Sequence, residues 1–125
     1  LMVENTDMAL AKTCKTLHCE IIDYTVAPIF MKGKEKGGHE WIIEFKKHPA
    51  SSAAFSELLD KNLQQVNSDY EAKRFNNMTL NPLVLTVARE HLFYDWLKKK
   101  DKLGGQHKIP RLSNSRDYLE ELKEM

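Results

Sequence analysis

The sequence lacks the features that mark several large classes of protein. Among its 125 residues, 19 are basic and 18 are acidic, so the formal net charge is only +1. Because neither sign is in excess, the broad basic surface of a nucleic-acid-binding protein is not expected. No apolar run approaches the length of a membrane-spanning helix, and the first residues show no signal-peptide pattern. We therefore expect a cytoplasmic protein with neither nucleic acid nor a membrane as its partner.

Cysteines and recognisable catalytic motifs are also scarce. The two cysteines, Cys14 and Cys19, are too few for a disulfide framework, which favours a reduced, intracellular protein. Cys14 and His18 have the i, i+4 spacing of helical metal ligands, but no second ligand pair follows, so no metal site is expected. The sequence has no GxSxG nucleophile elbow, no P-loop and no dinucleotide-binding fingerprint, which excludes several common enzyme classes.

The residues that are present predict one folded domain. Hydrophobic residues make up 42% of the chain and charged residues 30%, and 125 residues are enough to bury one core. Residue 1 is Leu rather than Met, so a piece of a longer protein is one expectation, and the natural length stays open. We expect the chain 1–125 to be a monomer.

Hydrophobic residues with helical spacing predict five helices. Their expected ranges are roughly 6–18, 51–66, 69–75, 90–101 and 115–124. Polar side chains that can accept a hydrogen bond from the first turn precede these ranges. The expected caps are Asn5 or Thr6, Ser51 or Ser52, Ser68 (in a capping box with Glu71), and Ser113 or Asn114.

Alternating hydrophobic residues predict the strands. The range 19–31 is β-branched and aromatic, with Ile22, Tyr24 and Val26 on one face, and Pro28 in it implies a bulge or an edge. In the range 40–46, three buried side chains alternate with Glu40, Ile42, Glu44 and Lys46, which predicts one buried face. These two strands should pair as an antiparallel ribbon through a polar connection, 32–38, whose lysines are expected to be solvated.

A third apolar run, 83–88, predicts a central strand. The expected order, α-β-β-α-α-β-α-α, is typical of an α+β domain. We predict a small, mostly antiparallel or mixed sheet of three to four strands flanked by helices. The aromatic residues expected in its core are Trp41, Phe45, Phe55, Phe93 and Trp96.

The segment 103–115 is the main functional candidate. Gly104 and Gly105 allow backbone conformations that other residues avoid, and Pro110 then holds the chain extended. Lys108 and Arg111 lie in this stiffened stretch. A glycine hinge followed by a rigid cationic tip suits the delivery of positive charge to a phosphate or carboxylate. From the spacing alone, an ordinary loop with two solvated cations is the simpler interpretation.

Three stretches of the chain together resemble one known family. They are GHEWIIEF at 38–45, NSDYEAKR at 67–74 and GGQHKIPR at 104–111. The resemblance is to the acyl-acid amido synthetases, the plant auxin-conjugating enzymes and their bacterial relatives, and specifically to their C-terminal domain. It covers nearly the whole chain. Its most specific parts are Tyr70-x-x-x-Arg74, Gln106-x-Lys108-x-Pro110-Arg111 and the following Ser113-Asn114-Ser115.

The resemblance implies an adenylate-forming ligase. In this family a large N-terminal domain, present in cis, binds ATP, Mg²⁺ and a carboxylic acid and makes an acyl-adenylate, which an amino acid then attacks to give an amide. The smaller C-terminal domain rotates over the active site between the two half-reactions. This chain would be that lid, inactive without the large domain, which holds most of the ATP and Mg²⁺ site.

The resemblance also implies roles for individual residues. Lys108 corresponds to the lysine of the lid that approaches the phosphate and acyl oxygens, whereas the hinge at Gly104 and Gly105 is inferred from their residue type. Arg111 and Gln106 are expected to position the substrate or the loop. Tyr70 and Arg74 are expected to be a structural pair at the edge of the sheet.

Two other interpretations stay open. One is the lid of a thioester-forming ligase of the same superfamily, in which a thiol replaces the amine. The other is a free-standing α+β module that binds a small anion or pairs with a partner through its sheet edge.

Overall fold

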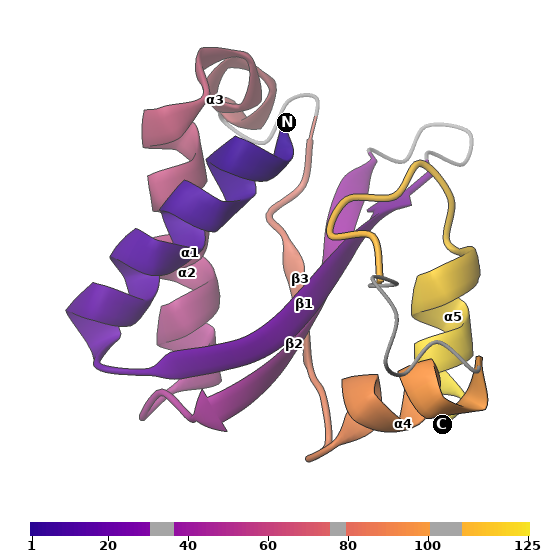
Figure 1. Cartoon of the computed structure of the whole chain (residues 1–125). Helices are drawn as coiled ribbons and strands as arrows, with labels where there is room; N and C mark the ends of the chain where they lie inside the picture. Colours follow the sequence, from indigo (N-terminus) through magenta and orange to yellow (C-terminus); the bar gives the residue numbers. More distant parts are fainter. Residues whose placement is uncertain (31–36, 76–79, 101–108) are drawn as a thin grey trace.

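The computed structural model describes residues 1–30, 37–75, 80–100 and 109–125 (Figure 1). Its helices and strands follow one another in the predicted order, and the predicted α+β class is confirmed. The elements are α1 (Val3–Leu17), β1 (Glu20–Ile29), β2 (Gly38–Lys47), α2 (Ser52–Val66), α3 (Ser68–Arg74), β3 (Val84–Val87), α4 (Leu92–Lys99) and α5 (Asp117–Lys123).

The described strands form one mixed sheet in the order β1-β2-β3. β1 and β2 pair antiparallel, as predicted, with Tyr24 opposite Ile43. β3 runs parallel to β2 and lies at the edge of the sheet, so the prediction that it is central was wrong. Val84 and Val87 of β3 are 46% and 41% exposed. A short apolar run looks the same in the sequence whether its strand is central or at an edge, because hydrophobic periodicity does not show which strands lie beside it.

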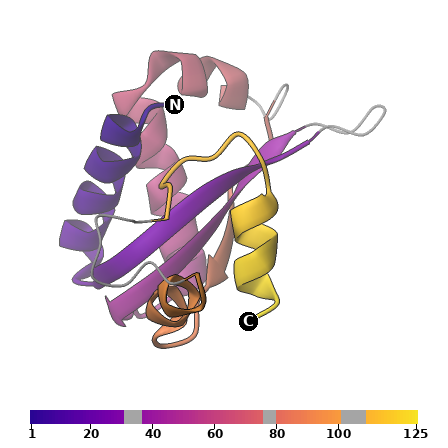
Figure 2. The same ribbon diagram turned by 45° about the vertical axis from the view of Figure 1, so that its right-hand side comes forward.

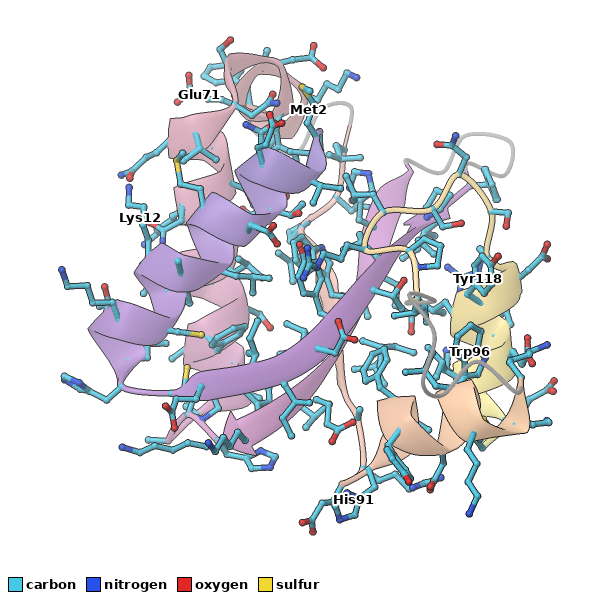
Figure 3. The ribbon with its side chains drawn as sticks, in the orientation of Figure 1. Met2, Lys12, Glu71, His91, Trp96 and Tyr118 are labelled. Atoms are coloured by element: carbon cyan, nitrogen blue, oxygen red, sulfur yellow. The ribbon has the colours of Figure 1, made fainter. Side chains whose placement is uncertain are left out.

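Helices cover both faces of the sheet (Figures 1 and 2). On one face, α1 and α2 pack against Trp41, Ile43 and Phe45 of β2. On the other, α4 and α5 pack against Ile42. The rings of Trp96 and Tyr118, labelled in Figure 3, meet edge-on with centroids 5.6 Å apart and join α4 to α5. The sheet therefore separates two hydrophobic clusters.

β2 is buried on both faces, and the prediction of a single buried face was wrong. Glu40 and Glu44 were expected in solvent, yet their residues are only 5% and 2% exposed. Buried carboxylates must be paired or hydrogen-bonded, and both are. Glu44 accepts hydrogen bonds from the backbone N–H groups of His91 (3.0 Å) and Phe93 (3.1 Å), and so caps α4 from the neighbouring strand.

The strand β1 begins with a distortion that sequence alternation does not reveal. Its register against β2 shifts between Glu20 and Ile21 and again between Ile21 and Asp23. Such a bulge turns the following side chains over. Ile22 is therefore 54% exposed instead of sharing the buried face of Tyr24 and Val26. The alternative prediction for Pro28, an edge strand, is confirmed, because β1 is the first strand of the sheet and the bulge lies elsewhere.

Several helix caps differ from those predicted. α1 begins after Met2, so Asn5 and Thr6 lie inside the helix, and Asn5 Oδ1 instead accepts from the Met2 N–H at 3.0 Å. Asn67, one residue before the predicted Ser68, caps α3. α5 begins after Arg116, beyond Ser113 and Asn114. The cap of α2 was predicted correctly: Ser51 accepts from the Ala54 N–H.

Candidate functional site

The functional segment predicted from the sequence is described from Ile109 onward. Gly104, Gly105, Gln106 and Lys108 lie outside the described residues. Arg111 is the one predicted site residue that the structure places. The geometry that follows concerns the segment 109–116 and the elements that hold it.

Residues 109–113 lie along the outer edge of β1. The Val26 N–H donates to the Arg111 carbonyl at 2.8 Å, and the Ser113 N–H donates to the Val26 carbonyl at 3.0 Å. Leu112 and Val26 thereby form a parallel bridge. The Thr25 hydroxyl adds a hydrogen bond to the Pro110 carbonyl at 2.7 Å. These bonds satisfy backbone groups at the edge of β1 and hold the segment against the sheet.

Ile109 anchors the start of this segment. It is 3% exposed and belongs to the hydrophobic cluster under α4 and α5. A side chain of this size contributes about 1.5–3 kcal/mol when it is fully buried. The chain directly after residue 108 is therefore fixed to the core, although this segment is not a regular strand.

The Arg111 side chain lies near a small polar cluster on α1 and β1. Its Nη1 is 3.6 Å from Asp7 Oδ2, and the two side chains are 44% and 46% exposed. Asp7 also accepts from the Tyr24 hydroxyl at 2.6 Å. Burial, together with the hydrogen bond to Asp7, raises the pKa of Tyr24, so this hydroxyl stays a neutral donor. Arg111 thus pairs with a carboxylate of the domain itself, in an exposed contact that contributes little energy.

The far end of the segment is clamped by Glu40, which the sequence analysis placed in solvent. Arg116 Nη2 donates to Glu40 Oε1 at 2.8 Å, and Arg116 Nη1 donates to the Pro28 carbonyl at 3.0 Å. Lys123 Nζ lies 3.1 Å from Glu40 Oε2. Burial by itself would raise the pKa of Glu40, but the hydrogen bonds from Arg116 and Lys123 outweigh it and lower the pKa. Nothing in the local sequence pattern pairs Glu40 with Arg116, because these two residues are 76 positions apart.

Tyr70 and Arg74 form a separate polar cluster between α3 and α2. Both side chains converge on Asp60 of α2: the Tyr70 hydroxyl donates to Oδ1, and the Arg74 guanidinium donates to both oxygens at 2.8–3.2 Å. The side chains of Arg74 and Asp60 are each 9% exposed. The predicted structural role is consistent with this geometry: the cluster joins α3 to α2, and Arg74 also donates to the carbonyl of Leu80, which bridges to Gly37 just before β2. The role of Asp60 as the shared partner of Tyr70 and Arg74 was not predicted. Its position next to Leu59 in the hydrophobic stretch of α2 could have indicated a buried, paired carboxylate.

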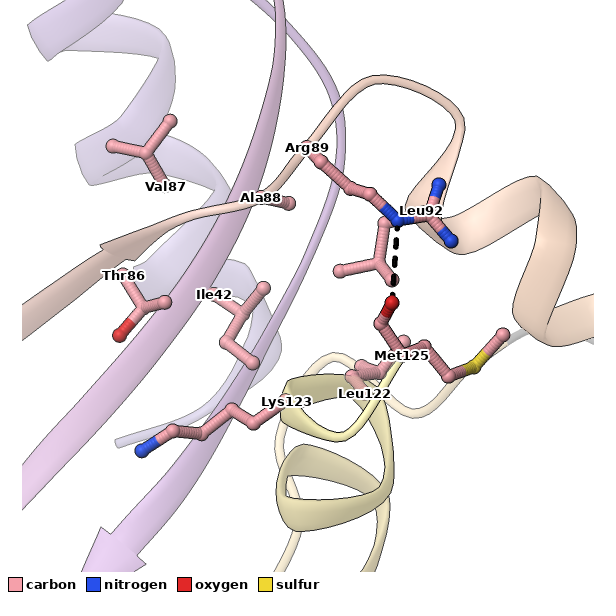
Figure 4. Close-up of a pocket in the computed structure, with 9 residues that line it drawn as sticks. All are labelled: Ile42, Thr86, Val87, Ala88, Arg89, Leu92, Leu122, Lys123 and Met125. Carbon is pink, nitrogen blue, oxygen red and sulfur yellow. Dashed lines mark hydrogen bonds between the residues drawn. The ribbon is translucent and has the colours of Figure 1, made fainter.

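Several hollows border the described part of the sheet, and two of them concern the segment and helices discussed here. One, of about 340 Å³, borders the anchored segment at Leu112–Asn114 and is also lined by Pro28, Phe30 and His39. Burial lowers the pKa of His39, so its imidazole is neutral near pH 7. The other, of about 230 Å³, is mainly apolar and lies between β3 and α5 (Figure 4). Its rim carries Arg89, whose Nε is 3.5 Å from the Met125 carbonyl oxygen.

The described part of the chain brings together no group of three or more His, Cys, Asp or Glu side chains that could hold a metal ion. None of the described helices is long and apolar enough to cross a membrane.

Comparison with known proteins identifies the family. Residues 4–117 match the GH3 family C-terminal domain. The chain therefore belongs to this family, and the resemblance found in the sequence is confirmed. No curated protein gives a significant match.

Solved structures share the fold at low sequence identity. A GH3.15 acyl acid amido synthetase superposes with a TM-score of 0.74 at 16% identity over 97% of this chain. The AtGH3.15 acyl acid amido synthetase in complex with 2,4-DB gives a TM-score of 0.72 at 15% identity over 98% of this chain. This chain spans only 23% and 22% of the lengths of these two proteins, respectively.

Proposed function

We propose that this chain is the mobile C-terminal domain of an ATP-dependent ligase that joins a carboxylic acid to an amino acid through an amide bond. The observation that carries the proposal is the match of residues 4–117 to the GH3 family C-terminal domain. The acid would react with ATP to form an acyl-adenylate and pyrophosphate. The amine would then attack the activated carbonyl, and AMP would leave.

In this proposal Lys108 is the catalytic residue of the domain. A lysine ammonium is a compact point charge, suited to a crowded phosphoryl centre that is gaining negative charge. Delivering that charge only when the domain closes makes the stabilisation specific to the reacting state, so that binding energy increases the rate. The neighbouring Ile109 supports this role, because its burial ties the chain beside Lys108 to the core.

The other sequence-predicted residues keep supporting roles. Gly104 and Gly105 would form the hinge of the segment, and Gln106 would position the substrate or the loop. Arg111 is best assigned to loop positioning, because it lies beside Asp7 of the same domain. The resemblance assigns ATP and Mg²⁺ mainly to a large adenylation domain in cis, and the whole would work in the cytoplasm. We expect the 125-residue chain alone to be inactive.

The test is made on the full-length protein that carries this domain. Lys108→Ala should lower ATP–pyrophosphate exchange or amide formation by a factor on the order of 10²–10³, while ATP binding is retained. Lys99→Ala is the matched control, because Lys99 is an exposed lysine of α4 and its loss should leave turnover unchanged. Wild-type turnover in Lys108→Ala would remove this residue from the mechanism.

A screen of acceptors then tests the reaction type. Supplying amino acids and thiols to the full-length protein with ATP and a panel of carboxylic acids should give amides. Formation of thioesters instead would assign the domain to a thioester-forming ligase. Failure to exchange pyrophosphate with any acid would favour a non-catalytic binding module.

A further inference from the structure

The C-terminal end of α1 brings the two cysteines together. His18, directly after the helix, adopts the left-handed conformation with φ 54° and ψ 47°. The Cys19 N–H donates to the Cys14 carbonyl at 3.1 Å. A left-handed residue followed by this backbone bond is the Schellman motif, in which the side chains flanking the turn commonly touch. Here those side chains are Cys14 and Cys19.

The two side chains lie beside each other at this turn. Burial, and next the neighbouring Cys19 side chain, raise the pKa of Cys14 to about 12. Both sulfurs are unoxidised in the structure. Cys14 is half-buried, whereas Cys19 is only 5% exposed, so a reagent from solvent reaches Cys14 first.

We propose that Cys14 and Cys19 form a vicinal dithiol site that closes to an intramolecular disulfide by exchange with a low-molecular-weight disulfide. In the first step the Cys14 sulfur attacks one sulfur of the small disulfide, giving a mixed disulfide and releasing one small thiol. In the second step the Cys19 sulfur attacks the Cys14 sulfur and releases the second small thiol. Two protein thiols are oxidised, and one external disulfide is reduced to two thiols. This site is independent of the proposed ligase activity.

The geometry favours ring closure over a stable mixed disulfide. A disulfide needs two Cα atoms close together, and the turn at His18 with the Cys14–Cys19 backbone bond brings the two residues together. The folded chain thus holds the second thiol at a high effective concentration beside the first. Because Cys14 is protonated at neutral pH, the first step is slow.

The sequence offers a direct assay, because Lys15 lies between the two cysteines. Complete trypsin cleavage separates Cys14, in the peptide 13–15, from Cys19, in the peptide 16–32. The native full-length protein is equilibrated with buffers of oxidised and reduced glutathione, and the reaction is quenched in acid. The protein is then digested with trypsin, and the peptide masses are measured by mass spectrometry. We expect peptides 13–15 and 16–32 to be joined by a reducible bond. The effective concentration of the Cys19 thiol at Cys14, measured from the yield of joined peptides, should be at least about tenfold higher in native protein than in protein unfolded in urea.

Single substitutions separate the two steps. Cys19→Ser should stop at the glutathione mixed disulfide on Cys14, and Cys14→Ser should leave Cys19 unmodified in the native protein. The native wild-type comparison needs no variant to fold and decides the matter by itself. The proposal is overturned if the joined peptides are no more abundant in folded than in unfolded protein, or if Cys14 carries glutathione at equilibrium while Cys19 stays reduced.

Discussion

Removing the carboxylate of Asp60 should strongly destabilise the fold. Asp60 accepts hydrogen bonds from Tyr70, Arg74 and Gln64, and it forms an ion pair with Arg74 in which both side chains are 9% exposed. Deleting one partner of a buried pair leaves the other charge uncompensated, which typically costs about 3–5 kcal/mol. Arg74 also donates to the Leu80 carbonyl, so we place Asp60→Ala near the lower end of this range, at about 3 kcal/mol.

The measurement is urea unfolding of the 125-residue chain, followed by tryptophan fluorescence. Trp41 and Trp96 are both fully buried and report on the two sides of the sheet. Glu57→Ala is the matched control on the same helix, because its ion pair with Lys61 is 65–72% exposed. An exposed pair of this kind contributes no more than about 1 kcal/mol.

A double-mutant cycle tests whether the pair itself causes the loss. Asp60→Ala combined with Arg74→Ala should lose at least about 1 kcal/mol less than the sum of the two single losses, because the second deletion removes the charge that Asp60 had paired. The reasoning is refuted if Asp60→Ala matches Glu57→Ala, or if the two deletions are simply additive. Either result would mean that the cluster seen in the structure does not hold α3 to α2.

Two further predictions concern the buried carboxylates of the fold. First, hydrogen bonds from basic side chains overcome the effect of burial and lower the pKa of both Asp60 and Glu40. The stabilisation that these two carboxylates give the folded state is therefore complete above the ordinary carboxyl pKa of about 4. It is lost as the pH falls through their lower pKa values in the folded state. The urea midpoint should drop between pH 5 and pH 3, and Asp60→Asn should reduce this drop; an equal slope in the variant would contradict the assignment. Second, Glu44→Gln replaces one of the two carboxylate oxygens that accept from the N–H groups at the start of α4. This should lower the free energy of unfolding by about 1–3 kcal/mol and speed amide exchange at His91 and Phe93. The control Glu90→Gln changes a side chain that is 83% exposed and should leave both quantities unchanged.

Much of the fold follows from short-range pattern. The ribbon of β1 and β2 was predictable because alternating apolar side chains and a polar connection are local features, and the register Tyr24–Ile43 agrees with them. The helices were predictable for the same reason, to within a few residues at their ends. The family was also within reach of the sequence, since its motifs are contiguous.

The polar contacts were not predictable in this way. Glu40 and Glu44 alternate with apolar residues as solvent-facing side chains do, and only the positions of Arg116 and of the first turn of α4 show that both are buried and satisfied. Asp60 likewise acquires its role from Tyr70 and Arg74 on the next helix. A charged side chain in a strand or helix can be read as exposed or as buried and paired, and its own sequence neighbourhood does not distinguish the two.

The amino-acid sequence by itself therefore determined the class of the fold, the order of its elements and the family, because periodicity, turn residues and contiguous motifs act over a few positions. Tertiary structure alone decided that β2 is covered on both faces, that β3 lies at the edge, that 109–113 runs along β1 and that Cys14 meets Cys19 across a left-handed turn. The physical reason is that burial, ion pairing and thiol contact depend on distances in space, which chain connectivity leaves open until the two hydrophobic clusters have packed.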